Sequence, residues 1–424
     1  MTEVQEVASG TAAQRSSTAQ RSSTAQRSST TQRSSTVRGW LGVGAVTAGT
    51  FTVVTSEMLP VGLLTPIGDA LRVSEGVAGL SLTVTGLVAA VSAPVLTAVL
   101  GRFDRRFVMC VLMAVLVLGN LGAAWSPNFG VMLGARVLVG IGMGGVWAIA
   151  ASLATRLVPA RSVGAATSLV FSGVAVASVL GIPAGTYLGA LAGWRVAFLA
   201  AAGLAALVLI AMAVLLPRLP AAQVVPLGGV FRLLRQPRLR TGLLVVAFLV
   251  TGHFAAYTYI RPVLEQVTGV GAATIGTLLL VYGIAGVIGN FGSGAAAART
   301  PRTTLIALSV TLAATVFLVP ALGGSLALAA LLMVVWGLSY GGVSVSTQSW
   351  IFAASPDAKE GASSLFAGVF NAAIALGSLA GGLAADALGV TSVMWLGGAL
   401  ALAALSTAAF GSAPGRPQLG VSGK

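Results

Sequence analysis

Long apolar runs separated by short polar breaks recur along almost the whole chain, and they constrain its fold more than any other feature. Each run holds roughly 19 to 30 residues, and a helix needs about 20 apolar residues to cross the hydrocarbon core of a bilayer. Of the 424 residues, 56% are hydrophobic and only 8% are charged, which is typical of membrane proteins. The sequence therefore predicts an all-α integral membrane protein with twelve transmembrane helices. The runs lie at about residues 40–67, 77–100, 107–125, 131–154, 163–190, 195–216, 241–260, 272–297, 304–322, 325–354, 361–385 and 390–413.

The first 38 residues differ sharply from the rest, because they are polar and repetitive. The hexapeptide AQRSST occurs three times between residues 13 and 30, and TQRSST follows at residues 31–36. Such a segment cannot bury enough apolar surface to fold alone, so we predict a disordered cytoplasmic tail. The longest later break follows the sixth run and carries five arginines, which divides the runs into two sets of six. The expected divisions are a tail at 1–38, a first half at 39–217, a central loop at 218–240, a second half at 241–413 and a tail at 414–424.

The basic residues predict the orientation of the chain, because lysine and arginine gather in the cytoplasmic loops of membrane proteins. With the N-terminus inside, twenty of the 24 basic residues fall on the inner side. Three, Arg72, Arg195 and Arg261, fall on the outer side. We therefore expect both termini in the cytoplasm. An even number of helices fits the same asymmetry.

The break after the second run contains a compact charged motif. It consists of Gly101, Asp104, Arg105 and Arg106. A glycine allows a tight turn, and an aspartate can cap the next helix or pair with an arginine. Such a contact can form and break as two halves of a protein rock against each other.

The fourth and fifth runs carry glycine motifs. Arg136 opens the segment RVLVGIG in the fourth run, and the fifth run places a proline among glycines, which bends a helix and lets it pack closely. The residues of this second motif are Gly173, Gly181, Pro183 and Gly185. With the charged turn, these motifs resemble the signature loop, the fourth-helix pattern and the antiporter motif of the major facilitator superfamily. Two features depart from the family pattern: Ile182 separates glycine from proline, and Ala298 stands where the second half would repeat the aspartate.

The resemblance extends over about residues 39–410. The segments SEMLPVGLL at 56–64 and YTYIRP at 257–262, with Asn371, look like the branch of bacterial drug and sugar exporters, which includes arabinose-efflux-like and chloramphenicol-resistance-like permeases. The resemblance implies two six-helix halves around a central cavity, lined mainly by helices 1, 4, 5, 7, 8, 10 and 11. It also implies transport by alternating access across the inner membrane of a bacterium.

Glu57 is the one carboxylate that lies deep within an apolar run, since the other nine acidic residues lie in the tail or near breaks. A charge at this depth is costly and usually has a function. Helix 1 runs outward and helix 4 inward, which places Glu57 about 6 Å and Arg136 about 9 Å outside the midplane. We predict that the two side chains pair and that protonation of Glu57 loosens the pair and promotes substrate release. A static structural pair is the alternative.

Six more polar side chains lie within the apolar runs of the second half, where the substrate cavity is expected. Such residues also serve as hydrogen-bonding links between helices, and the single histidine can titrate near neutral pH. The candidates for the cavity are His253, Tyr257, Tyr259, Asn290, Gln348 and Asn371.

Several classes of function lack the residues they need. One histidine and one cysteine cannot build a metal cluster or a disulfide, no phosphate-binding glycine loop occurs, and no basic face interleaves with aromatic residues. We therefore expect no enzyme activity, cofactor, metal or nucleic-acid partner. The prediction is a monomeric, proton-coupled exporter of a small drug-like compound, with the lipid bilayer, the substrate and protons as its partners. A sugar or sugar-like metabolite exporter is the close alternative, and a channel or receptor on a transporter scaffold is a further one.

Overall fold

The computed structural model describes residues 2–100, 103–159, 162–219, 231–297 and 299–412, and these ranges contain helices but no strand. Twelve helices, some of them broken, are long and apolar enough to cross a membrane, which confirms the predicted fold. The first six are α1 (Thr2–Leu71), α2 (Glu75–Val99), α3 (Arg105–Ala124), α4 (Phe129–Leu157), α5 with η3 and α6 (Val163–Val176, Ala177–Gly181, Ile182–Ala192), and α7 (Trp194–Leu215). The second six are α8 with α9 (Pro237–Tyr257, Ile260–Val267), α10 (Ala272–Ala297), α11 (Pro301–Leu322), α12 with α13 (Leu326–Gly341, Val343–Ala354), α14 (Lys359–Leu388) and α15 (Ser392–Phe410). Two short 3-10 turns, η5 (Phe231–Arg235) and η6 (Pro356–Ala358), precede α8 and α14.

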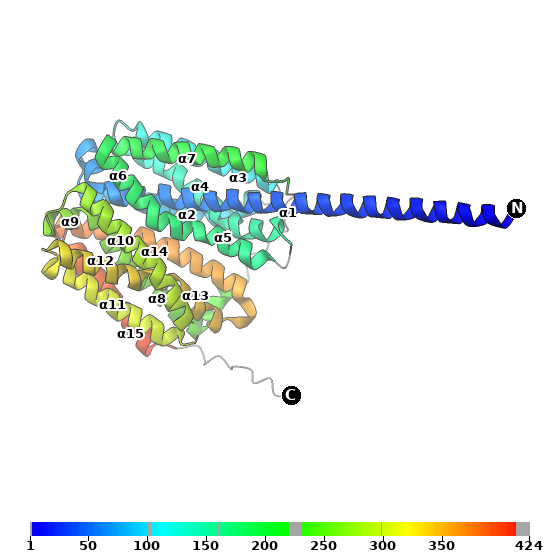
Figure 1. The fold of residues 1–424 in the computed structure, drawn as a ribbon. Helices are drawn as coiled ribbons and strands as arrows, with labels where there is room; N and C mark the ends of the chain where they lie inside the picture. The colour runs from blue at the N-terminus through cyan, green and yellow to red at the C-terminus, as the bar shows by residue number, and fades with distance from the viewer. Residues whose placement is uncertain (1, 101–102, 160–161, 220–230, 298, 413–424) are drawn as a thin grey trace.

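The two sets of six helices lie side by side (Figure 1). They meet where α2 packs on α14, where α6 packs on α10, and where α1 approaches α9. The largest buried apolar cluster crosses this boundary, with Leu82 and Ile182 from the first set and Leu249 and Ile275 from the second. We call the end of the bundle where α1 enters and α15 finishes the terminal face, and the other end the far face.

Three of the membrane helices are interrupted, and each interruption has a local cause. The fifth helix contains the π-helical turn η3 directly before Ile182 and Pro183, because a proline cannot continue the regular hydrogen-bond ladder. The seventh breaks between α8 and α9, four residues before Pro262, whose missing N–H leaves the Thr258 carbonyl without its helical donor. The tenth breaks between α12 and α13 at Gly342.

The N-terminal tail is continuous with the first membrane helix. Helix α1 begins at Thr2 and extends from the bundle as one long rod, where the sequence predicts a disordered segment over residues 1–38 (Figure 1). Starting a helix is the costly step, and each added residue then gains one hydrogen bond. The membrane-embedded part of α1 supplies that start, and no proline precedes Pro60. The division of the chain into two tails, two halves and a central loop, with a disordered first tail, stays a prediction.

Candidate functional site

Arg136 is completely buried between three helices of the first half, and it is bound by backbone oxygens. Pro60 has no N–H, so α1 leaves the carbonyl of Ser56 without its helical donor. The Nη1 atom of Arg136 donates to that carbonyl at 2.8 Å, and Nη2 donates to the Glu57 carbonyl at 2.8 Å. The Nε atom donates to the carbonyl of Ser81 in α2 at 3.0 Å. Arg136 therefore ties α4 to both α1 and α2.

The Glu57 side chain is 4% exposed, and its Oε1 atom has no hydrogen-bond partner. Within the described part of the chain, its carboxylate forms no ion pair with Arg136, which binds the Glu57 backbone instead. The predicted pair is thus a close approach without a direct contact between the charged groups in this conformation. The carboxylate still interacts electrostatically with Arg136 and, across the boundary between the halves, with Tyr340.

Five aromatic side chains from α8, α10 and α12 form a cluster that includes two of the predicted cavity residues. The ring of His253 stacks nearly parallel on Tyr340 at 3.3 Å between centroids, and Tyr257 lies 4.9 Å away from it. The Nε1 atom of Trp336 donates to His253 Nδ1 at 3.0 Å, which assigns the proton of the neutral ring to Nε2. Tyr282 stacks on Tyr257 at 4.7 Å. The cluster is therefore an ordered stack of rings rather than loose packing.

Three of the buried polar atoms without a hydrogen-bond partner belong to Glu57 and to two rings of the cluster. They are Glu57 Oε1 from α1, the Tyr257 hydroxyl from α8 and the Tyr340 hydroxyl from α12. A buried polar group without a hydrogen bond costs about 1–3 kcal/mol, so such groups call for an explanation. Their position between the two halves is suited to a ligand that offers hydrogen bonds to both.

The other predicted cavity residues lie elsewhere. The hydroxyl of Tyr259 donates to a carbonyl of α14, and Gln348 donates to a serine of α14. Asn371 bonds to a carbonyl of its own helix, and Asn290 is half-buried on α10. The structure therefore brings together only His253 and Tyr257 of the six.

Sequence reasoning missed Tyr282 and Tyr340 as members of the site. The chain contains five tyrosines, and three of them belong to this cluster. The scarcity of tyrosine in such an apolar chain was a usable signal. The sequence does not show, however, that α8, α10 and α12 pack together, because this depends on the tertiary structure.

The antiporter motif lies directly against α1. A Cβ atom at Gly173 would meet the Thr50 side chain and backbone atoms of α1, and one at Gly181 or Gly185 would meet other α1 side chains. Pro183 occupies the first turn of α6. The glycines thus allow the broken fifth helix to approach the helix that carries Glu57. A role in preventing proton leak stays a prediction.

The charged loop motif contacts its own half. Asp104 caps α3 by accepting the N–H groups of Arg106 at 2.9 Å and of the next residue, and it also binds the segment after α7. The Arg106 guanidinium donates to a carbonyl in the last turn of α7, and Arg105 is buried. Gly101 lies outside the described residues. The predicted exchange of contacts between the halves stays a prediction.

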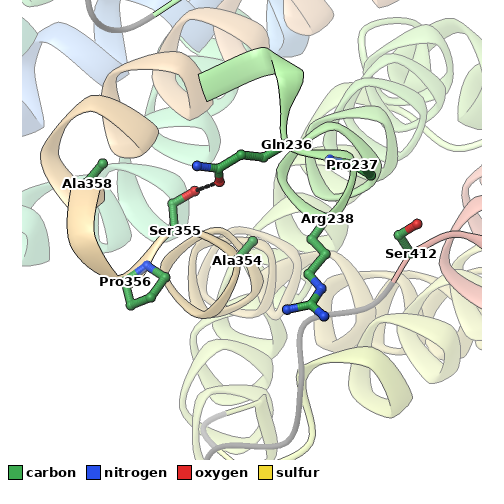
Figure 2. Close-up of a pocket in the computed structure, with 8 residues that line it drawn as sticks. All are labelled: Gln236, Pro237, Arg238, Ala354, Ser355, Pro356, Ala358 and Ser412. Atoms are coloured by element: carbon green, nitrogen blue, oxygen red, sulfur yellow. Dashed lines mark hydrogen bonds between the residues drawn. The ribbon is translucent and has the colours of Figure 1, made fainter. Parts of the chain in front are cut away.

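A hollow lies at the terminal face of the second half (Figure 2), where Ser355 donates to Gln236 at 2.8 Å. It opens beside Pro237, the first residue of α8, whereas His253 lies sixteen residues further along, about 24 Å away by helical rise. The hollow contains none of the predicted site residues. It is lined by Gln236, Pro237, Arg238, Ala354, Ser355, Pro356, Ala358 and Ser412.

Comparison with known proteins identifies the family. The model of the Major Facilitator Superfamily matches residues 46–367. The chain belongs to the major facilitator superfamily. It is therefore a multi-pass membrane transporter and not an enzyme.

Two similar proteins of known name align with most of this chain. The purine ribonucleoside efflux pump NepI of Salmonella paratyphi A is 36% identical over 371 residues, which cover 87% of this chain and 94% of that protein. The transcription regulatory protein OpdE of Pseudomonas aeruginosa is 36% identical over 369 residues, with 86% and 92% covered. Two solved structures share the fold. A bacterial homologue of the human lysosomal transporter Spinster has a TM-score of 0.71 and 16% sequence identity, with 88% of this chain and 96% of that chain covered. The human organic anion transporter MFSD10 has a TM-score of 0.63 and 19% identity, with 87% of this chain and 99% of that chain covered.

Proposed function

We propose that this transporter is a proton-coupled exporter of a small organic compound, acting as a monomer in the bacterial inner membrane with both termini in the cytoplasm. The observation that carries the proposal is the set of three buried polar atoms without partners. Glu57, Tyr257 and Tyr340 contribute them from both halves of the molecule. A substrate bound there would contact both halves at once, as alternating access requires.

The chemistry of the site narrows the drug-like substrate to a planar ring that carries hydroxyl groups. Tyrosine rings stack on flat heteroaromatic molecules, their hydroxyls donate or accept hydrogen bonds, and a carboxylate accepts them. A purine ribonucleoside combines such a ring with a sugar, so it also fits the sugar-like alternative. The name of the similar NepI proteins, purine ribonucleoside efflux pumps, supports the same substrate class.

Glu57 would couple the substrate to the proton. As a carboxylate it accepts hydrogen bonds from the substrate, and the nearby Arg136 lowers the cost of its buried charge. Protonation removes that charge and weakens the hold on the substrate. Because Arg136 is already bound by three carbonyls, it stays in place while Glu57 titrates. Substrate and proton then occupy the site in turn, which is antiport.

Uptake of a radiolabelled purine ribonucleoside into inverted membrane vesicles tests the proposal. We expect accumulation that needs an imposed proton gradient and disappears with a protonophore. The Glu57→Gln variant should lose gradient-driven accumulation but retain exchange of labelled for unlabelled nucleoside across the membrane. Asp69→Asn serves as the matched control, because Asp69 is exposed at the far face.

Three results would refute separate parts of the proposal. Full gradient-driven accumulation by Glu57→Gln would exclude Glu57 as the coupling residue. Nucleoside flux that persists without any gradient and without exchange would favour a channel. Absence of nucleoside uptake, together with gradient-dependent efflux of other compounds, would refute the substrate class alone.

A further inference from the structure

A second proline in α1 exposes a second carbonyl, and this one faces the other half of the molecule. Pro66 lacks the N–H that would bond to the carbonyl of Gly62, four residues earlier. The Nη1 atom of Arg261, from α9, donates to that carbonyl at 2.6 Å. Arg261 is 7% exposed, so little water is available to replace the contact.

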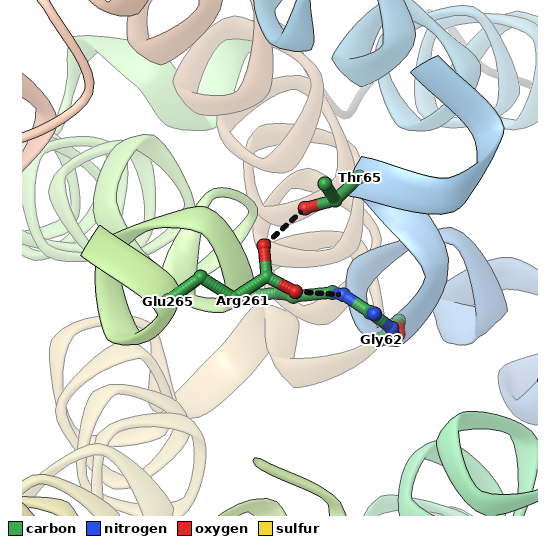
Figure 3. Close-up of polar contacts among 4 residues, drawn as sticks. All are labelled: Gly62, Thr65, Arg261 and Glu265. Atoms are coloured by element: carbon green, nitrogen blue, oxygen red, sulfur yellow. Dashed lines mark hydrogen bonds and ion pairs between the residues drawn. The ribbon is translucent and has the colours of Figure 1, made fainter. Parts of the chain in front are cut away.

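Glu265 holds Arg261 in position and adds a second link between the same helices. Its Oε1 atom accepts from Arg261 Nε at 2.9 Å, one turn apart on α9. Its Oε2 atom accepts from the Thr65 hydroxyl of α1 at 2.7 Å. Figure 3 shows the resulting group of Gly62, Thr65, Arg261 and Glu265, which we call the latch.

The latch belongs to a wider set of contacts that close the far face. Asp386 of α14 accepts from the Ser74 hydroxyl at 2.7 Å and from the Gly76 N–H at 3.0 Å, both at the start of α2. The Ser378 hydroxyl donates to the Gly79 carbonyl at 2.9 Å. These contacts hold α2 against α14 at the same end of the bundle, so the conformation seen here is closed at the far face.

We propose that the carbonyl released by Pro66 is the docking point of a conformational latch, through which Arg261 and Glu265 hold the far face closed. A transporter that works by alternating access must separate its halves at this face to release substrate. The latch must then open. Helix α9 is short and follows the break after α8, so it can move without carrying the whole seventh helix.

Pro60 and Pro66 differ in which half of the molecule supplies the arginine that binds the released carbonyl. Pro60 and Pro66 each leave one carbonyl without its helical donor, and an arginine donates a hydrogen bond to each of these carbonyls. Arg136 comes from the same half as α1, so its bonds can persist throughout the cycle. Arg261 comes from the other half, so its bond reports which face is closed. The proposal concerns the conformational equilibrium and does not depend on the identity of the substrate.

Distances between pairs of spin labels test the latch in the full chain, reconstituted in nanodiscs without substrate. Cys110 is the only cysteine, so Cys110→Ser gives a clean background. Labels at Trp125→Cys and Gly324→Cys report on the far face, because these positions are exposed in the two halves at that end. We expect the shorter of the two distance populations, which corresponds to the closed far face, to dominate in the parent protein.

Two variants weaken the latch in different ways. Arg261→Gln removes the charged donor, and Pro66→Ala restores the N–H that competes for the Gly62 carbonyl while leaving the side chains of the latch unchanged. We expect each to raise the ratio of open to closed far face by about tenfold, as for loss of one charge-assisted hydrogen bond. Pro320→Ala is the matched control, because Pro320 also lies within a helix near the far face, in α11, outside the latch.

The double variant separates the latch from general destabilisation. If Arg261 acts through the released carbonyl, Pro66→Ala with Arg261→Gln should shift the ratio by less than the product of the two single shifts. An unchanged distance distribution in both single variants would overturn the proposal. So would a shift in Arg261→Gln with none in Pro66→Ala, because the released carbonyl would then have no part in closure.

Discussion

In the interior of the first half, the buried arginine bonds to backbone carbonyls rather than to a carboxylate, and a proline accounts for one of these bonds. Pro60 removes one backbone donor from α1, and Arg136 replaces it at the Ser56 carbonyl while also serving two further carbonyls. Water is absent from the hydrocarbon core, so without Arg136 each of these carbonyl oxygens would lose a hydrogen bond that water could not replace. Arg136 is therefore a structural requirement of α1 as well as a neighbour of Glu57.

We expect Arg136→Gln to reduce the free energy of unfolding by about 3 kcal/mol, because a shorter neutral side chain cannot reach all three carbonyls. The loss should be smaller when it is made together with Pro60→Ala, since the alanine N–H bonds to the Ser56 carbonyl. Thermal unfolding in detergent, followed by fluorescence, measures both. Equal losses with and without Pro60→Ala would show that the Ser56 carbonyl contributes little.

At this scale the sequence predicts the important charges but not their contacts. Glu57 and Arg136 could be identified because charges are rare in apolar runs, and their depths were matched by counting residues. Arg136 could reach either the carboxylate or the backbone, and only the structure decides between them. The proline four residues after Ser56 was a readable sign of a free carbonyl.

Among the elements, the broken fifth helix connects a sequence motif to its packing most directly. Its glycines bring α5, η3 and α6 against α1, and the Thr50 hydroxyl donates to the Val170 carbonyl across this contact at 2.8 Å. The length of this helix follows from hydropathy. Its π-helical turn does not, because that turn depends on how backbone dihedrals adapt around Pro183 between two packed helices.

Gly173→Ala tests the close contact between the fifth helix and α1. Its new Cβ would press on backbone atoms of α1, which cannot move aside as a side chain can. We expect a loss of about 1–3 kcal/mol in stability and reduced export. Gly203→Ala in α7, where the new methyl group meets open space, should be neutral or slightly stabilising. Similar thermal stability in the two variants would argue against tight packing at Gly173.

Across the whole molecule, the two halves repeat one way of ending a helix. Arg106 donates to a carbonyl in the last turn of α7, and Arg302 donates to two carbonyls in the last turn of α15. A cation at the C-terminus of a helix also compensates the negative end of its dipole. The weak sequence likeness between the two charged loops thus corresponds to equivalent contacts, although the second lacks the aspartate.

The orientation of the whole molecule can be tested by labelling with a membrane-impermeant maleimide in the Cys110→Ser background. Phe103→Cys, at the terminal face, should be protected in intact spheroplasts and react only after lysis. Trp125→Cys, at the far face, should react in intact spheroplasts, since Trp125 is 69% exposed. The reverse pattern would mean that the termini are outside.

The count of helices was predictable because twelve long apolar runs leave few other folds. The position of the proposed substrate site was not, since His253, Tyr282 and Tyr340 come from three helices whose shared side depends on how the second half packs. Tyr259 and Asn371 were equally good candidates by sequence. They lie in other contacts because a polar residue in a membrane helix also serves its neighbouring helices.

The spacing of the two prolines in α1 determines where their carbonyls point. Six residues of α-helix turn through about 600°, which leaves the Ser56 and Gly62 carbonyls about 120° apart in azimuth and about 9 Å apart along the axis. One therefore faces Arg136 and the other Arg261. Moving either proline by a single residue would rotate its carbonyl by about 100°, away from its arginine. The interval between the prolines, rather than either proline alone, allows one helix to bind both halves of the transporter.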